Sequence, residues 1–452
     1  MQKLNVYSST TIQKTNCRFL GKNMIFTTTS STDFEKQFQE LLGRGKMDIE
    51  QVSAIVGNII NEIKNDKNQA LKAHIAKFDK WTPQNDSDLK IDSALMKKAY
   101  DVLDSELKSS LHLAYERIKV YHEKQKPKSW FDTEENGTIL GQKVTPVDSA
   151  GLYIPGGKAA YPSSLLMNVI PAQVAGVENI VVCTPTPENE PNELLLAACH
   201  LCGVTEVYKV GGASAIAAMA YGTETIPKVD VITGPGNIFV ATAKKMVFGE
   251  VNIDMIAGPS EIGVLADESA NTNHLAIDML SQAEHDEMAS SILITPSQKV
   301  ADEVKVEIEN WLAKLPREEI ARKSIEERGA IIVTKDMDEA VSLMNEVAPE
   351  HLEVATNNPF ELLASIKHAG AIFLGHYTPE AVGDYVAGPN HTLPTGGTAK
   401  FYSPLGVENF MKKSSIISFS KAAINEIGEA CALIANTESL TAHEQSVRVR
   451  LD

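Results

Sequence analysis

The sequence predicts an α/β protein with two domains, each built around a parallel β-sheet. The chain has 452 residues, which is enough for two domains with cores of their own. From about residue 145, short β-rich segments alternate with helical ones, and this alternation is typical of βαβ units. The alternation comes in two successive sets, 150–233 and 262–374, so we expect two sheets.

Runs of β-branched residues predict the strands, and apolar residues at helical spacing predict the helices. The first set comprises strands at Ala150–Ile154, Asn179–Cys183, Val207–Val210 and Val229–Thr233, with helices at Ser163–Ala175 and Asn192–Leu201. The second set comprises strands at Ile262–Ala266, Ile292–Thr295, Ala330–Val333, His351–Ala355 and Ala371–Leu374, with helices at 270–284 and 337–347. Residues 33–126 read as helical, and the chain ends in a helix at 419–435 and a tail of the kind that packs on a partner subunit.

Composition limits the function classes. A net charge of −17 and the lack of a long Lys/Arg run argue against nucleic acid as a partner. No apolar stretch is long enough to cross a membrane, and charged residues interrupt the N-terminus where a secretion signal would need an apolar core. We therefore expect a cytoplasmic protein without a membrane partner, and Met24 is a candidate for the true start.

The five cysteines are sparse and odd in number, which suits a reducing compartment. Cys199 and Cys202 have the spacing of a redox or zinc motif, but they lie in an apolar helical run and no second such motif exists. We favour buried helix positions for both.

Two glycine-rich segments follow predicted strands and precede predicted helices. They are 151–157 and 234–237, and backbone N–H groups at such helix starts can bind an anion. Neither is the dinucleotide fingerprint GxGxxG. Together, however, they predict a ligand crevice in the first set.

Glu350 and His351, a carboxylate beside an imidazole, are the first candidate catalytic residues. Such a pair can move protons at neutral pH, although most Glu-His dipeptides are solvated surface. Other polar residues occur at Gln282 and His285, which share one helix face. Metal chemistry alone would favour His285 with a carboxylate, because glutamine is an uncommon ligand, and a solvated helix end remains an alternative.

Further polar residues lie in a turn-rich loop, which offers Asp384 and His391, and in the tail, which offers Glu438 and His443. Functional residues favour loops held by a scaffold, whereas a histidine in a tail is usually solvated.

Taken together, these segments resemble the histidinol dehydrogenase family, from about residue 50 onward and in the family's order. Residues 1–23 have no counterpart that we recognise. The segments that carry the resemblance are Tyr-Ile-Pro-Gly-Gly at 153–157, Val-Gly-Gly-Ala at 210–213, Gly-Pro-Gly-Asn at 234–237, Ala-Gly-Pro-Ser-Glu at 257–261, Ser-Gln-Ala-Glu-His at 281–285, Pro-Glu-His at 349–351, Gly-Asp-Tyr at 383–385, Asn-His-Thr-Leu-Pro at 390–394 and Leu-Thr-Ala-His at 440–443.

The resemblance implies a fold of two incomplete Rossmann-like α/β domains, with terminal segments that swap between the subunits of a homodimer. It implies the following division: an N-terminal segment 1–44, a first domain formed by 45–152 and 261–380, a second domain 153–260 on the NAD side, and a C-terminal region 381–452 that contributes to the partner's site.

The implied activity is the zinc-dependent, NAD-linked four-electron oxidation of L-histidinol to L-histidine through L-histidinaldehyde, the final step of histidine biosynthesis. Two NAD⁺ are used, and one zinc ion is bound per subunit in sites that both subunits share. Manganese or cobalt could also occupy a site of nitrogen and oxygen ligands.

By the same resemblance, Glu350 and His351 are the proton-transfer pair. The implied zinc ligands are Gln282, His285, Asp384 and His443, with His443 from the other subunit. The implied substrate positions are Ser260, Gln282, His285, His351, Asp384, His391, Glu438 and His443. The implied NAD contacts are Tyr153, Asn237 and Ser214, where Ser214 stands in place of the family's usual glutamine and has a shorter reach.

Two other functions deserve comparison. A dehydrogenase on the same fold could act on another small hydroxylated compound, such as a sulfonated diol, but the metal and substrate positions above are all present. A non-enzymatic nucleotide- or zinc-binding regulator would not need Glu350 and His351 together with that metal set. NADH formation from histidinol, with and without a chelator, separates the three.

Overall fold

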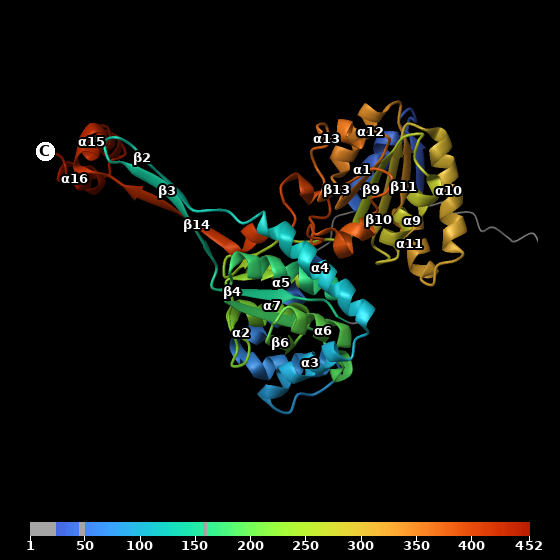
Figure 1. Cartoon of the computed structure of the whole chain (residues 1–452), viewed down its shortest axis with the longest axis horizontal. Helices are drawn as coiled ribbons and strands as arrows, with labels where there is room; N and C mark the ends of the chain where they lie inside the picture. The colour runs from blue at the N-terminus through green and yellow to red at the C-terminus, as the bar shows by residue number, and fades with distance from the viewer. Residues whose placement is uncertain (1–23, 45–49, 157–160) are drawn as a thin grey trace, which may run out of the picture. The chain divides into compact units, whose positions relative to one another are not determined.

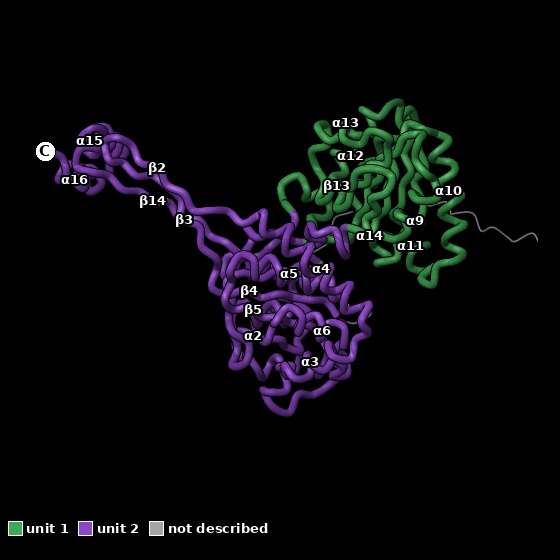
Figure 2. Tube along the Cα trace, viewed as in Figure 1, with its two compact units in different colours: residues 1–47, 257–382, 393–403 green, residues 48–256, 383–392, 404–452 purple. Residues whose placement is uncertain are grey.

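The computed structural model describes residues 24–44, 50–156 and 161–452 (Figure 1). The chain forms two compact units (Figure 2). Unit 1 comprises 1–47, 257–382 and 393–403, and unit 2 comprises 48–256, 383–392 and 404–452. Residues 1–23 of the expected N-terminal segment, and Gly157 at the end of the first glycine loop, lie outside the described residues.

Unit 2 contains a five-stranded parallel sheet in the order β6-β5-β4-β7-β8. Its strands are β4 Ser149–Tyr153, β5 Asn179–Thr184, β6 Glu206–Lys209, β7 Val231–Thr233 and β8 Asn252–Ile253. Its helices are α2 Glu50–Phe78, α3 Ser93–Asp101, α4 Ser105–Glu123, α5 Pro162–Ala175, α6 Glu193–Leu201, α7 Gly212–Tyr221 and α8 Ile238–Val247, with short 3₁₀ turns at Asp86–Leu89 and Pro187–Asn189.

Helices cover both faces of this sheet, and each face has its own core. On one face α3, α4, α5 and α6 pack over Leu152, Val182 and Val207. On the other face α2, α7 and α8 pack over Val181 and Ile232. Because α2 and α3 pack on this unit's helices, residues 48–152 group with 153–256, whereas we expected 45–152 to join 261–380.

The cysteine prediction is confirmed in this unit. Cys199 lies in α6 with none of its surface exposed, and Cys202, just after the helix, is 5% exposed. Burial raises the pKa of the Cys199 thiol to about 12 and raises that of Cys202 as well. Both thiols are therefore core side chains rather than redox or metal groups.

A second, antiparallel sheet in unit 2 was not predicted. Its order is β14-β3-β2, with β2 Trp130–Thr133, β3 Ile139–Pro146 and β14 Met411–Ser418. The chain then forms α15 Lys421–Thr437 and α16 Thr441–Arg448, which pack on each other. Short 3₁₀ turns at Thr398–Lys400, in unit 1, and Val407–Phe410, in unit 2, precede β14.

Unit 1 contains a six-stranded parallel sheet in the order β1-β11-β10-β9-β12-β13. Its strands are β1 Ile25–Thr28, β9 Glu261–Ala266, β10 Ser290–Thr295, β11 Ala330–Val333, β12 His351–Ala355 and β13 Ala371–Leu374. Its helices are α1 Phe34–Arg44, α9 Thr272–Ala283, α10 Gln298–Leu312, α11 Glu318–Arg328, α12 Met337–Val347, α13 Pro359–Leu363 and α14 Glu380–Val382, after which Gly383–Ala387 continues as a π-helical turn.

The central strands of unit 1 are buried on both faces, as parallel strands between two helical layers are. Helices α9, α10 and α11 cover the face that carries Ile262, Val264 and Ala355. Helices α1 and α12 cover the face that carries Leu352 and Val354. Since side chains alternate along β12, His351 and Glu353 must share the α9 face with Ala355. Two ionisable groups of β12 thus lie beside the apolar side chains of Ile262 and Val264.

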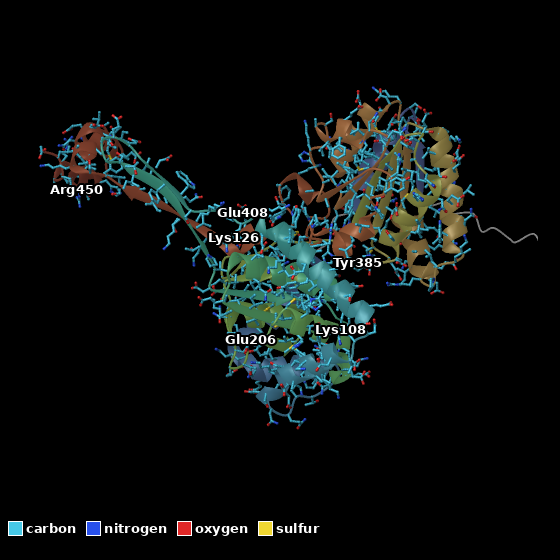
Figure 3. All side chains as sticks on the ribbon, in the orientation of Figure 1. Lys108, Lys126, Glu206, Tyr385, Glu408 and Arg450 are labelled. Carbon is cyan, nitrogen blue, oxygen red and sulfur yellow. The ribbon has the colours of Figure 1, made fainter. Side chains whose placement is uncertain are left out.

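The surface carries both charge signs. Figure 3 shows Lys126 and Glu206 among the side chains of unit 2, and Glu206 accepts a hydrogen bond from Lys90 at 2.6 Å. Exposed pairs of this kind contribute little to stability.

Among the described residues, no helix combines the length and the apolar content that a membrane crossing requires.

Candidate active site

The predicted catalytic pair is held by the backbone of one residue, Glu261. Strand β12 pairs with β9 so that His351 lies beside Ile262. The N–H of Glu261 donates to Glu350 Oε2 at 2.9 Å, and His351 Nδ1 donates to the carbonyl oxygen of Glu261 at 3.2 Å. We assign the proton to Nδ1 because a carbonyl can only accept, which places the lone pair of a neutral ring on Nε2. His351 is therefore oriented with Nε2 as its basic atom.

Both members of the pair are buried, with Glu350 6% exposed and His351 4% exposed. His351 Nδ1 lies 3.8 Å from Glu350 Oε2 and 3.9 Å from Glu380 Oε1. Carboxylates at this distance favour the protonated imidazole. The surroundings of His351 therefore stabilise the charge that the ring acquires when it accepts a proton.

The side chain of Glu261 is a buried acid beside this pair. Burial, and next the charge of Glu350, raises the pKa of Glu261 to about 8. Its Oε2 accepts a hydrogen bond from the N–H of Gly396 at 3.0 Å. Glu261 is thus mostly protonated at neutral pH.

Helix α9 presents two polar residues to the polar face of β12. Asp278 and Gln282 are four residues apart and share one side of the helix, opposite Glu353 and His351. Burial, and next the charge of Asp278, raises the pKa of Glu353, while burial raises that of Asp278 to about 6. The two carboxyls form a hydrogen bond, which requires a shared proton.

The amide of Gln282 is oriented by Glu380. With its nitrogen toward that carboxylate, Gln282 donates at 2.9 and 3.2 Å to the two oxygens of Glu380. The nitrogen is also 3.1 Å from His351 Nδ1, but an Nδ1 that donates to Glu261 cannot accept, so we assign the bonds to Glu380. Glu380 is 2% exposed, and its own N–H donates to Glu353 Oε1 at 2.8 Å.

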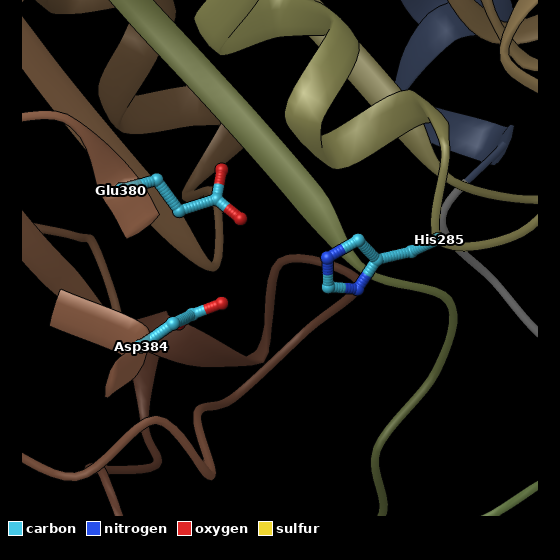
Figure 4. A group of neighbouring side chains, drawn as sticks. All are labelled: His285, Glu380 and Asp384. Atoms are coloured by element: carbon cyan, nitrogen blue, oxygen red, sulfur yellow. The ribbon is translucent and has the colours of Figure 1, made fainter. Parts of the chain in front are cut away.

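A group with metal-ligand geometry lies next to these residues. His285, Glu380 and Asp384 each offer one ligand atom, and these atoms lie within 4.8 Å of one another. Figure 4 shows the imidazole and the two carboxylates pointing toward one another. Glu380 and Asp384 are four residues apart in one helical stretch, so the chain brings them together locally. His285 follows the last turn of α9, and its N–H donates to the Gln282 carbonyl oxygen at 3.2 Å.

Two of the predicted NAD residues, Tyr153 and Asn237, lie where the strand order in the parallel sheet of unit 2 reverses, at the ends of β4 and β7. The chain runs from β4 through β5 to β6 on one side, and through β7 to β8 on the other. Ligands of open parallel sheets bind at the carboxyl ends of the two strands that flank such a point. Tyr153 ends β4, and the loop 234–237 follows β7. The two predicted glycine segments therefore meet at one edge.

Local hydrogen bonds fix both predicted contacts at this edge. The hydroxyl of Tyr153 accepts from the N–H of Gly212 at 3.2 Å, and burial raises the pKa of Tyr153 to about 12. Asn237 caps α8, with its Oδ1 accepting from the N–H groups of Phe239 and Val240 at 3.1 and 3.3 Å. Asn237 thereby keeps its amide nitrogen as a donor.

Ser214 is engaged inside unit 2. It is 4% exposed, and its Oγ lies 2.9 Å from Nδ1 of His74. The other ring nitrogen of His74 lies 2.6 Å from Glu62 Oε2. The hydroxyl is therefore part of a polar contact between α2 and α7, which limits its reach toward a cofactor.

The other predicted substrate residues lie in several places. Ser260 precedes β9, and its carbonyl oxygen accepts from the N–H of Ser290 at 3.0 Å. His391 has Nδ1 3.0 Å from the carbonyl oxygen of Asp384 and Nε2 3.3 Å from Ser164 Oγ. Glu438 and His443 are exposed and line a pocket of unit 2 formed by α15 and α16. Among the described residues, the metal-type group contains His285 and Asp384 but not His443.

Comparisons with known proteins decide the family. The family model described as Histidinol dehydrogenase matches residues 42–451. A histidinol dehydrogenase of Sulfurimonas denitrificans is 81% identical over 95% of this chain and 100% of its own length, and one of Wolinella succinogenes is 68% identical over 93% and 98%. The crystal structure of histidinol dehydrogenase from Elizabethkingia anophelis superposes with a TM-score of 0.89 at 36% identity, covering 94% of this chain and 98% of that one.

The chain belongs to the histidinol dehydrogenase family. It is therefore an oxidoreductase of histidine biosynthesis, and the family's α/β fold with parallel-sheet cores is confirmed. For a histidinol dehydrogenase the donor set described above fits a zinc ion, because imidazole nitrogen and carboxylate or amide oxygen are ligands that zinc accepts.

Sequence reasoning missed two residues of this site, Glu261 and Glu380. Glu261 ends the motif 257–261, so its position was noticed, but its contacts with the catalytic pair arise from the register of β9 and β12. Glu380 stands four residues before Asp384, a spacing that places two carboxylates on one helical face. That spacing was the available signal.

Proposed function

We propose that this chain oxidises L-histidinol to L-histidine through L-histidinaldehyde, with two NAD⁺, at a zinc site beside Glu350 and His351. One observation carries the proposal. The backbone of Glu261 holds both side chains at once, giving Glu350 a defined carboxylate position and His351 a defined basic nitrogen. A base and a water activator are the two groups that a two-step alcohol and aldehyde oxidation requires.

Gln282, His285 and Asp384 would hold the zinc, with His443 of the partner subunit as a further ligand. When bound, the ion would orient the substrate's nitrogen atoms and thereby place the reacting carbon. Glu380 supports this set by binding the amide nitrogen of Gln282, which leaves the amide oxygen as the ligand atom. Ser260, His391 and Glu438 would contact the substrate, with Glu438 opposite its ammonium group.

NAD⁺ would lie along the edge formed by Tyr153 and Asn237, and it would accept one hydride in each step. Tyr153 offers a neutral hydroxyl, and burial raises its pKa further, to about 12. Asn237 offers the amide nitrogen that its capping role leaves as a donor. Ser214 contributes less than the usual glutamine would, since its hydroxyl contacts His74.

His351 acts as the base in both oxidations. In the first step its Nε2 takes the alcohol proton while the hydride leaves, and the nearby carboxylates stabilise the resulting imidazolium. Glu350 then takes a proton from the water that adds to the aldehyde. His351 takes the proton of the hydrate in the second oxidation, after losing the first to solvent.

The proposed assembly is a homodimer in which each subunit supplies His443 and Glu438 to the other. In support, α15 exposes a row of large apolar side chains beside these residues: Ile427, Leu433 and Ile434 are 46%, 63% and 61% exposed. Exposed apolar patches of this kind mark protein interfaces. Terminal segments that swap between subunits would cover them.

Two variants test the proposal. His351→Asn should lose both oxidations by about a thousandfold or more, because the base is gone. Glu350→Gln should keep oxidising L-histidinol to the aldehyde stage but lose oxidation of supplied L-histidinaldehyde. Stopped-flow NADH formation with each substrate separates the steps. A Glu350→Gln protein that oxidises the aldehyde at the wild-type rate would refute the role given to Glu350.

A further inference from the structure

Unit 2 contains a buried ion pair that the proposed mechanism does not use. Lys244 in α8 is 2% exposed at its side chain and Asp254, just after β8, is 0% exposed. The ammonium and the carboxylate are in direct contact. Desolvating two charges is costly, and well-packed apolar side chains are often as stable or more stable at such positions. Stability alone therefore does not explain why charges stand here.

Both charges bind the backbone of the same residue, Gly234. Lys244 Nζ donates to the carbonyl oxygen of Gly234 at 3.0 Å, and the N–H of Gly234 donates to Asp254 Oδ2 at 2.8 Å. Asp254 Oδ1 also accepts from the N–H of Met255 at 2.6 Å. The pair thus holds one peptide position from both sides with charge-assisted hydrogen bonds, which are stronger than neutral ones.

Gly234 has no side chain through which it could be held, and its surroundings leave no space for one. Its φ is +118°, and a Cβ added there would come within 2.0 Å of the carbonyl oxygen of Tyr153. This position can therefore be held only through its backbone. Gly234 is the first residue of the loop 234–237, which follows β7 where the strand order reverses. It lies between Tyr153, at the end of β4, and Asn237.

We propose that the Lys244–Asp254 pair is a positioning device that fixes the glycine loop 234–237 in the shape that receives NAD⁺. The proposal rests on the cofactor role given to this loop above. Both charged side chains are buried and would act on the loop through Gly234. The pair pre-forms the loop, so that binding does not have to order it.

The test is a set of charge-neutral substitutions. The double variant Lys244→Met/Asp254→Asn removes both charges together, so that neither is left buried without its partner. We expect this variant to unfold cooperatively, to bind NAD⁺ at least about tenfold more weakly, and to keep its KM for L-histidinol within about twofold. Lys245→Met removes a charge from the neighbouring exposed position and should leave NAD⁺ affinity unchanged.

The outcomes are distinguishable. A folded double variant that binds NAD⁺ as tightly as the wild type overturns the positioning role and leaves the proposed function intact. A wild-type protein that binds no NAD⁺ overturns the proposed function, and the positioning role with it. A parallel rise in the KM values of both substrates would indicate general damage and also contradicts the proposal.

Hydrogen exchange in the wild-type protein keeps the proposal testable if the double variant does not fold. The amides of Gly234 and Met255 should be protected without NAD⁺, and adding NAD⁺ should change their protection little. Amides that exchange rapidly until NAD⁺ is added would show that the cofactor, and not the ion pair, orders the loop, and the proposal would be wrong.

Discussion

At the scale of single residues, the backbone of Glu261 fixes the positions of the two residues of the proposed catalytic pair. Its N–H binds Glu350, its carbonyl oxygen binds His351, and its own carboxyl remains protonated beside them. The dipeptide Glu350–His351 could be singled out from the sequence through the family resemblance, because an adjacent acid and base alone are common on protein surfaces. The role of Glu261 could not, since residues 89 and 90 positions apart meet only through the pairing of β9 with β12.

The raised pKa of Glu261 predicts a pH effect on stability. Between its ordinary value of 4.5 and about 8, the folded protein keeps this proton while the unfolded chain loses it. The free energy of unfolding should therefore fall as pH rises through this window, by up to about 1.4 kcal/mol per pH unit from this group. Glu261→Gln should remove that slope, so the free energy of unfolding of the variant should rise relative to that of the wild type by about 3–4 kcal/mol between pH 5 and pH 8.

Urea unfolding of wild type and Glu261→Gln at several pH values measures this difference. Glu268→Gln, at an exposed position of unit 1, is the matched control and should follow the wild-type curve. A wild-type slope that persists in Glu261→Gln would show that other groups cause it.

The strands and helices that carry the site were largely predictable at the scale of elements. Ala330–Val333, His351–Ala355 and Ala371–Leu374 have the predicted bounds. Ala330–Val333 could be predicted because a buried parallel strand reads as an uninterrupted apolar run. The antiparallel strands β2 and β3 were missed. All of Trp130–Thr133 is exposed, so no alternation of buried and exposed residues marks that strand.

Close packing of β9 against the segment that precedes β12 should make the site sensitive to one methyl group. A Cβ at Gly263 would lie 2.6 Å from Met344 Sδ and 2.9 Å from Pro349 Cγ, directly before Glu350. We expect Gly263→Ala to cost about 1–3 kcal/mol of stability and to lower kcat, because β9 must move away from the catalytic pair. NAD⁺ affinity should stay the same, since that edge belongs to unit 2.

Gly43→Ala is the control for that substitution. Nothing lies within 4 Å of a Cβ added at Gly43, which is in helix α1, so this variant should be neutral or slightly more stable. Thermal unfolding and steady-state kinetics of both variants measure the two effects on stability and on kcat. Equal effects of the two substitutions would contradict the packing explanation.

The division of the chain into units could not be predicted at the scale of the whole molecule. The sequence marks α2 and α3 as helices, but it does not show on which sheet they pack, and they pack in unit 2. His443 lies on α16 with Glu438 nearby. In the proposed dimer, His443 of each subunit would complete the zinc site of the other subunit.

Shared sites predict that two inactive variants can restore each other. His351→Asn lacks the base, and His443→Ala lacks the partner-derived ligand, so each alone should be nearly inactive. When the two chains are co-expressed, half of the dimers should be hybrids with one complete site each, giving about a quarter of wild-type activity.

The control is co-expression of His443→Ala with the double variant His351→Asn/His443→Ala, where no complete site can form. Activity in this control, or none in the hybrid sample, would contradict sites that both subunits share.

The central claim is that one site carries out both oxidations in sequence. The most direct measurement is the amount of NADH formed per L-histidinol consumed by the zinc-loaded protein, with the product identified by mass spectrometry. We expect two NADH per L-histidinol and L-histidine as product, with activity lost on chelation and restored by zinc. One NADH per substrate with accumulating aldehyde, or no NADH at all, would contradict it.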